Sequence, residues 1–254
     1  MKTSIIALVA LATAFVIPMP SASASGKTLQ AYRHIQLNGH RVKWGVPLAG
    51  VGAVVTYATL DAPLRFPEAR NCRSMVPMTS LLQSTGITQS AFEVELRTAF
   101  DLWSAVADIR FVRATHPDAA DILIGAQAEP RGRAFTNIEF DSAGTPGGIR
   151  ELTRSTICFS PAERWKIGFD GNLDVYDLRY TLLHEIGHAI GLDHPAIDSQ
   201  LMDFRYSERF RTPQRGDVMG VAALYGPSGT PTASVQDDRQ GIVRVRAQRM
   251  RSGG

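Results

Sequence analysis

The stretch that decides the fold is His184-Glu-Ile-Gly-His-Ala-Ile-Gly-Leu-Asp-His194, in a chain of 254 residues. Residues four apart on a helix lie one turn apart on the same face, so His184 and His188 can direct two imidazoles at one point. Neutral imidazole is a good zinc ligand. Glu185 follows His184 directly, so its carboxylate emerges beside the metal, where it can act as a general base for water without being a ligand.

The third histidine of the stretch lies where a continuing helix would carry it away from the other two. Gly191 permits a positive φ at little steric cost, so the chain can turn sharply and bring His194 back. Three histidines leave a fourth coordination position open, which is typical of a catalytic rather than a structural zinc. We therefore predict one Zn²⁺ ion held by His184, His188 and His194. The alternative is a surface helix with satisfied histidines, which the clustering of three of the six histidines disfavours.

The composition is that of an ordinary globular protein, with 44% hydrophobic and 20% charged residues. It excludes a long disordered chain, a collagen-like repeat and a coiled coil. The 27 basic and 24 acidic residues give a net charge of +3, which is too balanced to indicate nucleic-acid binding.

Residues 1–24 have the pattern of a secretory signal peptide. Lys2 precedes an apolar run over residues 5–17, and Ala22-Ser-Ala24 follows. The run is shorter than the roughly 20 apolar residues that span a bilayer, although an N-terminal membrane anchor is the alternative. We expect no membrane span, cleavage near Ala24, and a secreted protein, either extracellular or periplasmic.

The regions next to both ends are weakly patterned. Residues 25–41 are polar, and we expect a loose lead-in there. Residues 228–254 are rich in arginine and poor in large apolar residues, which predicts a disordered basic tail. Such a tail favours weak association with anionic surfaces, although a solvated terminus is the simpler interpretation.

Hydrophobic periodicity places the elements between these ends. Strands are predicted near 53–59, 109–112, 121–126, 133–140 and 155–159, and proline-rich residues 61–86 are expected to be irregular. Helical spacing predicts helices over 90–106, 173–190 and 217–225. Ser90 with Glu93 fits a capping box for the first helix, and Asn172 or Asp174 can cap the second.

Cys72 and Cys158 are the two cysteines of the chain. An exported protein can hold disulfides, so the simplest expectation is one bridge between them, with two buried free thiols as the alternative. Two cysteines so far apart do not fit a thiolate zinc site, which favours closely spaced pairs.

The zinc segment resembles the metzincin metallopeptidases, and the matrixin branch in particular. Ser199-Gln-Leu-Met-Asp203 is similar to the family's Met-turn, with Met202 beneath the zinc, and residues 217–226 resemble the closing helix of matrixins. Residues 99–106 and 118–124 resemble the first helix and the strand that follows. The resemblance covers residues 42–227 and implies an α+β fold. Its twisted mixed sheet of about five strands packs on two long helices, and a small C-terminal subdomain follows the third zinc histidine.

The resemblance also implies a function. It predicts a monomeric, secreted zinc endopeptidase that hydrolyses internal bonds of a protein or peptide substrate, with Glu185 as general base. Tyr206 and Phe204 would wall the pocket for the residue after the cleaved bond, although Phe204 stands where matrixins commonly have proline. An extended substrate would lie along the edge strand near 133–137, lined by Ala134 and Phe135, and its residue after the cleaved bond would be apolar.

The chain departs from the family in several places. It has no P-R-C-G motif, so Cys72 is not expected to block the zinc, and residues 127–159 contain no histidine for a second, structural zinc. The sequence leaves open a Ca²⁺ ion at Asp141 or Asp170. Two alternatives to an enzyme are a non-catalytic extracellular zinc-binding module and a cationic surface-binding protein. The intact Glu185 and zinc histidines argue against the first of these.

Overall fold

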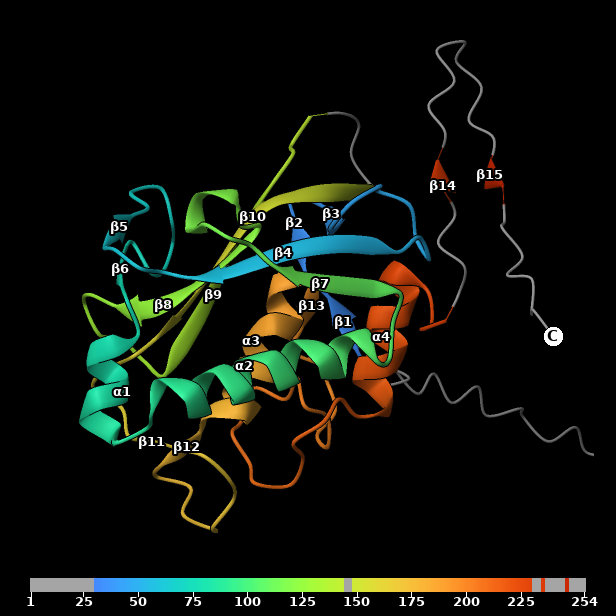
Figure 1. The fold of residues 1–254 in the computed structure, drawn as a ribbon. Helices are drawn as coiled ribbons and strands as arrows, with labels where there is room; N and C mark the ends of the chain where they lie inside the picture. The colour runs from blue at the N-terminus through green and yellow to red at the C-terminus, as the bar shows by residue number, and fades with distance from the viewer. Residues whose placement is uncertain (1–29, 144–147, 230–233, 236–244, 247–254) are drawn as a thin grey trace, which may run out of the picture.

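The mixed β-sheet at the centre of the fold has its long helices on one face (Figure 1). The structure is a computed structural model that describes residues 30–143, 148–229, 234–235 and 245–246. The predicted signal peptide and most of the predicted basic tail lie outside the described residues. No helix among the described residues is long and apolar enough to cross a membrane.

Five strands form the middle of the sheet in the spatial order β9, β10, β8, β4 and β7. Their bounds are Ala134–Phe140 (β9), Ile149–Phe159 (β10), Ile122–Gln127 (β8), Ala53–Thr59 (β4) and Ile109–Arg113 (β7). The last four run parallel, and β9 is antiparallel to β10. Every residue of β8 is buried, as expected for a parallel strand covered on both faces. These strands confirm the predicted mixed sheet.

Strand β9 lies at one edge of this arrangement. Among the described strands it pairs only with β10, so the backbone groups along its other side have no strand partner. Successive side chains of a strand point to opposite faces. Ala134 and Thr136 therefore lie on the helix-covered face, while Phe135 lies on the other.

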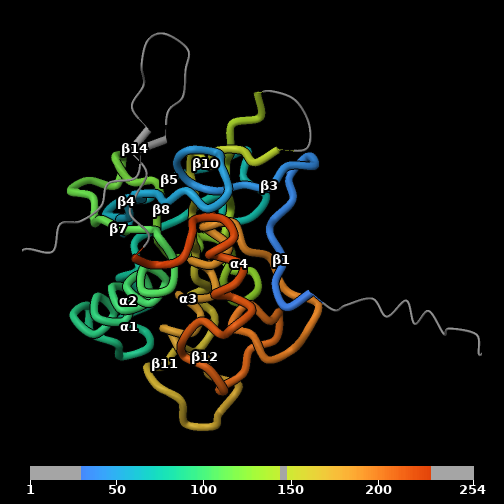
Figure 2. Tube along the Cα trace, turned by 90° about the vertical axis from the view of Figure 1, so that its right-hand side faces the viewer, coloured from blue at the N-terminus to red at the C-terminus, as the bar shows by residue number. Residues whose placement is uncertain are grey.

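The helices are α1 (Thr79–Thr85), α2 (Gln89–Ser104), α3 (Leu178–Ala189) and α4 (Arg215–Tyr225), with a 3-10 turn η1 (Pro117–Ala119). Helices α2 and α3 pack together on one face of the sheet (Figure 2), and the Tyr225 hydroxyl of α4 donates to the Ile190 carbonyl at the end of α3 at 3.0 Å. The fully buried Trp103 of α2 donates from its indole Nε1 to the Leu183 carbonyl of α3 at 3.0 Å. This hydrogen bond satisfies the polar atom of a large core side chain and links the two helices.

Both long helices begin at caps other than those predicted. Helix α2 follows Thr88, whose side chain accepts a hydrogen bond from the Ala91 backbone N–H. Helix α3 starts at Leu178 rather than 173, because Asp177 caps it by accepting from the Tyr180 N–H at 2.8 Å. The preceding residues instead form β12 (Tyr176–Asp177), which pairs with β11 (Trp165–Lys166).

The predicted lead-in is more regular than expected. It contains β1 (Arg33–His34), β2 (Gln36–Leu37) and the start of β3 (His40–Lys43). Strand β3 runs parallel to β10, and β1 pairs with β13 (Leu192–Asp193), directly after α3. The expectation of a loose segment was wrong here because strands this short show no alternation and depend on pairing with distant residues.

Residues 61–86, which were predicted to be irregular from their proline content, also contain regular secondary structure. Strands β5 (Leu64–Arg65) and β6 (Ser74–Val76) precede α1, and β6 pairs with β8. Pro77 and Gly86 suggested a loop, but they flank α1, in keeping with the preference for proline before and glycine after a helix. Gly86 has a φ of 68° and ends the helix.

A disulfide fixes this segment to the sheet. Cys72 is bonded to Cys158 of β10, with 5.9 Å between their Cα atoms. The bridge lies in a second hydrophobic cluster, on the face of the sheet away from the long helices. Two short strands, β14 (Ser234–Val235) and β15 (Val245–Arg246), pair with each other within residues 228–254.

Candidate metal centre

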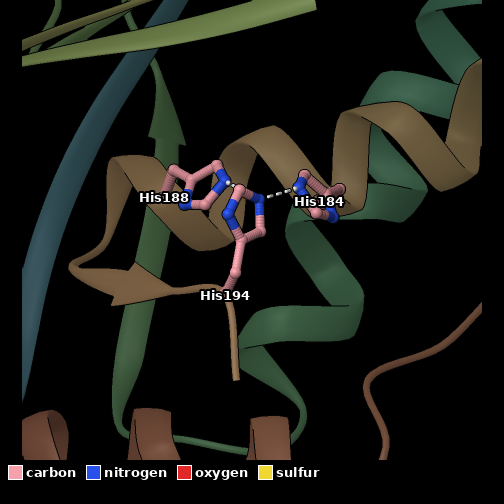
Figure 3. Close-up of side chains that lie close together, drawn as sticks. All are labelled: His184, His188 and His194. Carbon is pink, nitrogen blue, oxygen red and sulfur yellow. Dashed lines mark hydrogen bonds between the residues drawn. The ribbon is translucent and has the colours of Figure 1, made fainter. Parts of the chain in front are cut away.

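The structure brings the three predicted histidines together, as Figure 3 shows. His184 and His188 lie one turn apart on α3, and their Nε2 atoms are each 3.1 Å from the Nε2 of His194. In a tetrahedral site with Zn–N bonds of about 2.0–2.1 Å, two ligand nitrogens lie about 3.3 Å apart. The observed separations are therefore close to those that a zinc ion requires.

Backbone carbonyls orient two of these rings. The Nδ1 atom of His184 lies 3.0 Å from the Leu201 carbonyl oxygen, and that of His188 lies 2.8 Å from the Leu192 carbonyl oxygen. A carbonyl only accepts, so each Nδ1 carries the proton and each Nε2 presents a lone pair to the centre. His194 can donate to only one of these lone pairs, so a cation suits the three nitrogens better than a hydrogen bond does.

The charge state of the rings favours the same conclusion. Burial lowers the pKa of His184 and His188 below the ordinary histidine value, and for His184 the neighbouring His188 adds to the effect. Burial, followed by the charge of His188, lowers the pKa of His194 to about 4. Neutral imidazoles are the form that binds a metal. Among the described residues this is the single cluster of three or more metal-ligating side chains.

Gly191 makes the sharp turn that returns His194 to the site. Its φ is 100°, and a Cβ atom there would lie 2.3 Å from the Val42 carbonyl oxygen. Both facts require glycine, since a side chain disfavours this φ and would clash with the backbone. After the turn, β13 pairs with β1, which holds the residues just before His194.

Met202 lies in the turn beneath α3. It is buried, and a Cβ atom on Gly187 would lie 2.3 Å from its Sδ, so the methionine packs directly against the helix between the two zinc histidines. The buried Asp217 of α4 holds this turn by accepting from the N–H groups of Leu201 and Met202, at 2.8 and 3.1 Å. Sequence reasoning missed Asp217, although its place in the first turn of a predicted helix is a capping signal.

Glu185 is buried beside the histidines. Its Oε2 accepts a hydrogen bond of 2.7 Å from the Thr136 hydroxyl, which also lies 3.0 Å from the Glu185 carbonyl oxygen. Burial raises the pKa of Glu185, while the Thr136 hydrogen bond and the Arg133 charge oppose the rise. Thr136 was not predicted as a site residue, because nothing local in the sequence connects it to Glu185.

The predicted pocket residues fall into two groups. Phe204 is 73% exposed, with its ring centroid 5.2 Å from that of His194, and Tyr206 packs edge-on against Tyr180 of α3. Ala134 is half-buried in the core cluster on the helix side. Phe135 instead packs against the disulfide cluster on the opposite face. The alternation of β9 separates it from Ala134.

The two aspartates considered for Ca²⁺ have partners of their own. Asp141 accepts from the Ala143 N–H, which forms a local turn. Asp170 accepts from the Lys166 ammonium group and from the Asn172 N–H. The Lys166 side chain thus already supplies positive charge beside Asp170.

Comparison with known proteins identifies the family of this arrangement. A family profile described as Matrixin matches residues 77–226, which are more than half of the chain. Similar proteins are interstitial collagenase B of Mus musculus (27% identity), matrix metalloproteinase-20 of Homo sapiens (28%) and karilysin of Tannerella forsythia (29%). The alignments cover 73%, 81% and 56% of this chain, but 38%, 43% and 30% of those proteins. The chain thus spans less than half the length of the curated relatives it matches.

The profile match ends at the close of α4 and includes the histidine triad, the Met202 turn and four of the five central strands. The fold, the three converging histidines and the profile agree with one another. On this evidence, the chain belongs to the matrixin family.

Proposed function

We propose that the chain is a secreted zinc-dependent endopeptidase that hydrolyses internal peptide bonds of proteins. The observation that carries the proposal is the convergence of His184, His188 and His194 on one point, with the Glu185 carboxylate beside them. A zinc ion bound there would polarise the scissile carbonyl and make water more acidic. Secretion rests on the signal-like pattern of residues 1–24.

The protein side chains have separate tasks in this reaction. Glu185 accepts a proton from the attacking water and delivers it to the nitrogen of the departing amine as the C–N bond breaks. Thr136 holds the Glu185 carboxylate in place through its 2.7 Å hydrogen bond. The burial that raises the Glu185 pKa brings it closer to that of a proton carrier at neutral pH.

The substrate binds as an additional strand along the open edge of β9. Backbone hydrogen bonds of this kind give affinity for any extended peptide, and pockets for alternate side chains give selectivity. Tyr206 and Phe204 wall the pocket for the residue after the cleaved bond. Ala134 lies on the same face of β9 as Thr136, next to the reacting groups.

The test is a digest of a peptide library by the purified protein, with and without a zinc chelator. We expect cleavage at internal bonds, its loss with the chelator, and its return when zinc is restored. Glu185→Gln should bind zinc as the wild type does, yet cleave about 100-fold more slowly or worse, because general-base catalysis is lost.

Two other outcomes would point to the alternative functions. Zinc binding without cleavage of any peptide would identify a non-catalytic zinc-binding module. Deletion of residues 228–254 should leave peptidase activity intact. A different result would be a protein that cleaves no peptide, attaches to anionic surfaces, and loses this attachment on deletion of residues 228–254. That result would identify a cationic surface-binding protein.

A further inference from the structure

Arg133, immediately before β9, has an unusual environment. Its side chain is half-buried, and its Cζ atom lies 4.9 Å from the ring centroid of Tyr176 and 5.5 Å from that of Tyr206. Within the residues that the structure describes, its guanidinium group forms no ion pair and donates no hydrogen bond. Contacts with the faces of aromatic rings hold this cation in place without neutralising it.

The carboxylates nearest to these tyrosines already have partners. Glu208 accepts from the Tyr206 hydroxyl and forms an ion pair with Lys166. Asp177 forms an ion pair with Arg211 at 3.0 Å. The charge of Arg133 is therefore left available to a group from outside the described chain.

Two tyrosine rings connect Arg133 to the metal centre. Tyr206, which its guanidinium contacts, packs 5.0 Å from the ring of Tyr180, and Tyr180 stacks on His184 with 6.4 Å between centroids. Three residues further along, Thr136 binds Glu185. Burial is the main cause of both pKa shifts, and the positive charge of Arg133 adds to the lowering of the His184 pKa and opposes the rise of the Glu185 pKa.

The Arg133 guanidinium lies against Tyr206, which the proposed function places on the wall of a substrate pocket. Its planar set of N–H donors matches a carboxylate with two parallel hydrogen bonds, and partial removal from water strengthens the attraction. We propose that Arg133 determines specificity by binding a substrate carboxylate in the Tyr206 pocket, so that the residue after the cleaved bond is Asp or Glu. This inference rests on the proposed peptidase function and replaces the apolar preference expected from the family resemblance.

A substrate carboxylate has two sources, an acidic side chain or the C-terminus of a short peptide. The experiment uses quenched fluorescent peptides that differ only in the residue after the cleaved bond, which is Glu, Gln or Leu. Each peptide is made with a free and with an amidated C-terminus. We expect kcat/KM for the Glu peptide to exceed that for the Gln peptide by about tenfold or more, since a hydrogen bond to a charged group is stronger than one to a neutral group.

Amidation should not change this ratio, whereas a preference for free C-termini alone would overturn the assignment to a side chain. The ratio should fall in 1 M salt, because salt screens a partly exposed ion pair. Arg133→Met should bring the ratio close to one, and Arg133→Lys should keep a reduced preference for Glu. The matched control is Arg131→Met, an exposed arginine two residues earlier, which should leave all rates unchanged.

The two proposals fail in different ways. If the zinc-loaded wild type cleaves none of the peptides in the series or in the library, the peptidase function is wrong and the inference falls with it. If it cleaves the Leu or Gln peptide as well as the Glu peptide, and Arg133→Met leaves the ratios as they were, only the specificity is wrong. Zinc content and circular dichroism of each variant show that a changed ratio does not come from misfolding.

Discussion

The buried carboxylate of Asp217 holds the turn beneath the metal centre, so we expect its replacement to change both stability and zinc binding. Oδ2 accepts from the N–H groups of Leu201 and Gln214, at 2.8 and 2.7 Å, and Oδ1 accepts from that of Met202 at 3.1 Å. The Leu201 carbonyl in turn binds Nδ1 of His184. Asp217→Ala therefore affects both the stability of the fold and the orientation of one zinc ligand.

The magnitude follows from the number of groups left without a partner. Each unsatisfied buried donor costs about 1–3 kcal/mol, although water entering the new cavity recovers part of this. For three donors we expect Asp217→Ala to lower the free energy of unfolding by about 3–5 kcal/mol. Loss of support behind a metal ligand typically weakens metal binding 10- to 100-fold, so zinc affinity should fall by that factor.

The assay is urea unfolding of the zinc-free protein, followed by zinc titration against a competing chelator. Asp217→Asn keeps one acceptor oxygen but turns an amide N–H₂ group toward the remaining donors, so it should be destabilised as well. The control is Asp118→Ala, because Asp118 is exposed and should contribute little. An Asp217→Ala protein with wild-type stability and wild-type zinc affinity would refute the role given to this carboxylate.

Three further predictions concern other parts of the fold. Gly191→Ala should weaken zinc binding at least tenfold in the same titration, because the φ of Gly191 is 100° and the new Cβ would lie 2.3 Å from the Val42 carbonyl oxygen. Unchanged zinc affinity would show that the turn does not need glycine. The Cys72→Ser, Cys158→Ser double variant should lose about 4–5 kcal/mol of stability, because the disulfide joins residues 86 positions apart in the sequence. It should bind zinc normally, since the bridge lies on the face of the sheet opposite the metal centre. Burial lowers the pKa of Lys43 to about 8, so on raising the pH the folded state releases this proton before the unfolded state does. The free energy of unfolding of the wild type relative to Lys43→Met should therefore rise between pH 8 and about 10.5, by up to about 3 kcal/mol. A difference that stays constant over this range in urea titrations would contradict the lowered pKa.

The histidine cluster could be predicted from the sequence because its geometry is mostly local. His184 and His188 share a helix face by spacing alone, and a glycine three residues later marks the turn to His194. The buried strands were also recognisable, since β8 is a short continuous apolar run. In each case the pattern that carries the signal lies within about a dozen residues.

The contacts that complete the site are not local. Thr136 lies 49 residues from Glu185, and Asp217 lies 16 residues from Leu201, so no spacing rule connects either pair. Ala134 and Phe135 were predicted together as pocket residues, but a predicted strand does not reveal which of its two faces meets the helices. In the structure they pack against different hydrophobic clusters. Arg133 showed no signal in the sequence, because its importance comes from the absence of a partner in the folded chain.

The central claim is that three imidazoles hold one zinc ion. The most direct measurement is a crystal structure of the zinc-loaded protein with anomalous diffraction recorded on both sides of the zinc absorption edge. We predict one strong peak at bonding distance from the Nε2 atoms of His184, His188 and His194. No peak between these three rings, or zinc bound only elsewhere in the crystal, would contradict the account.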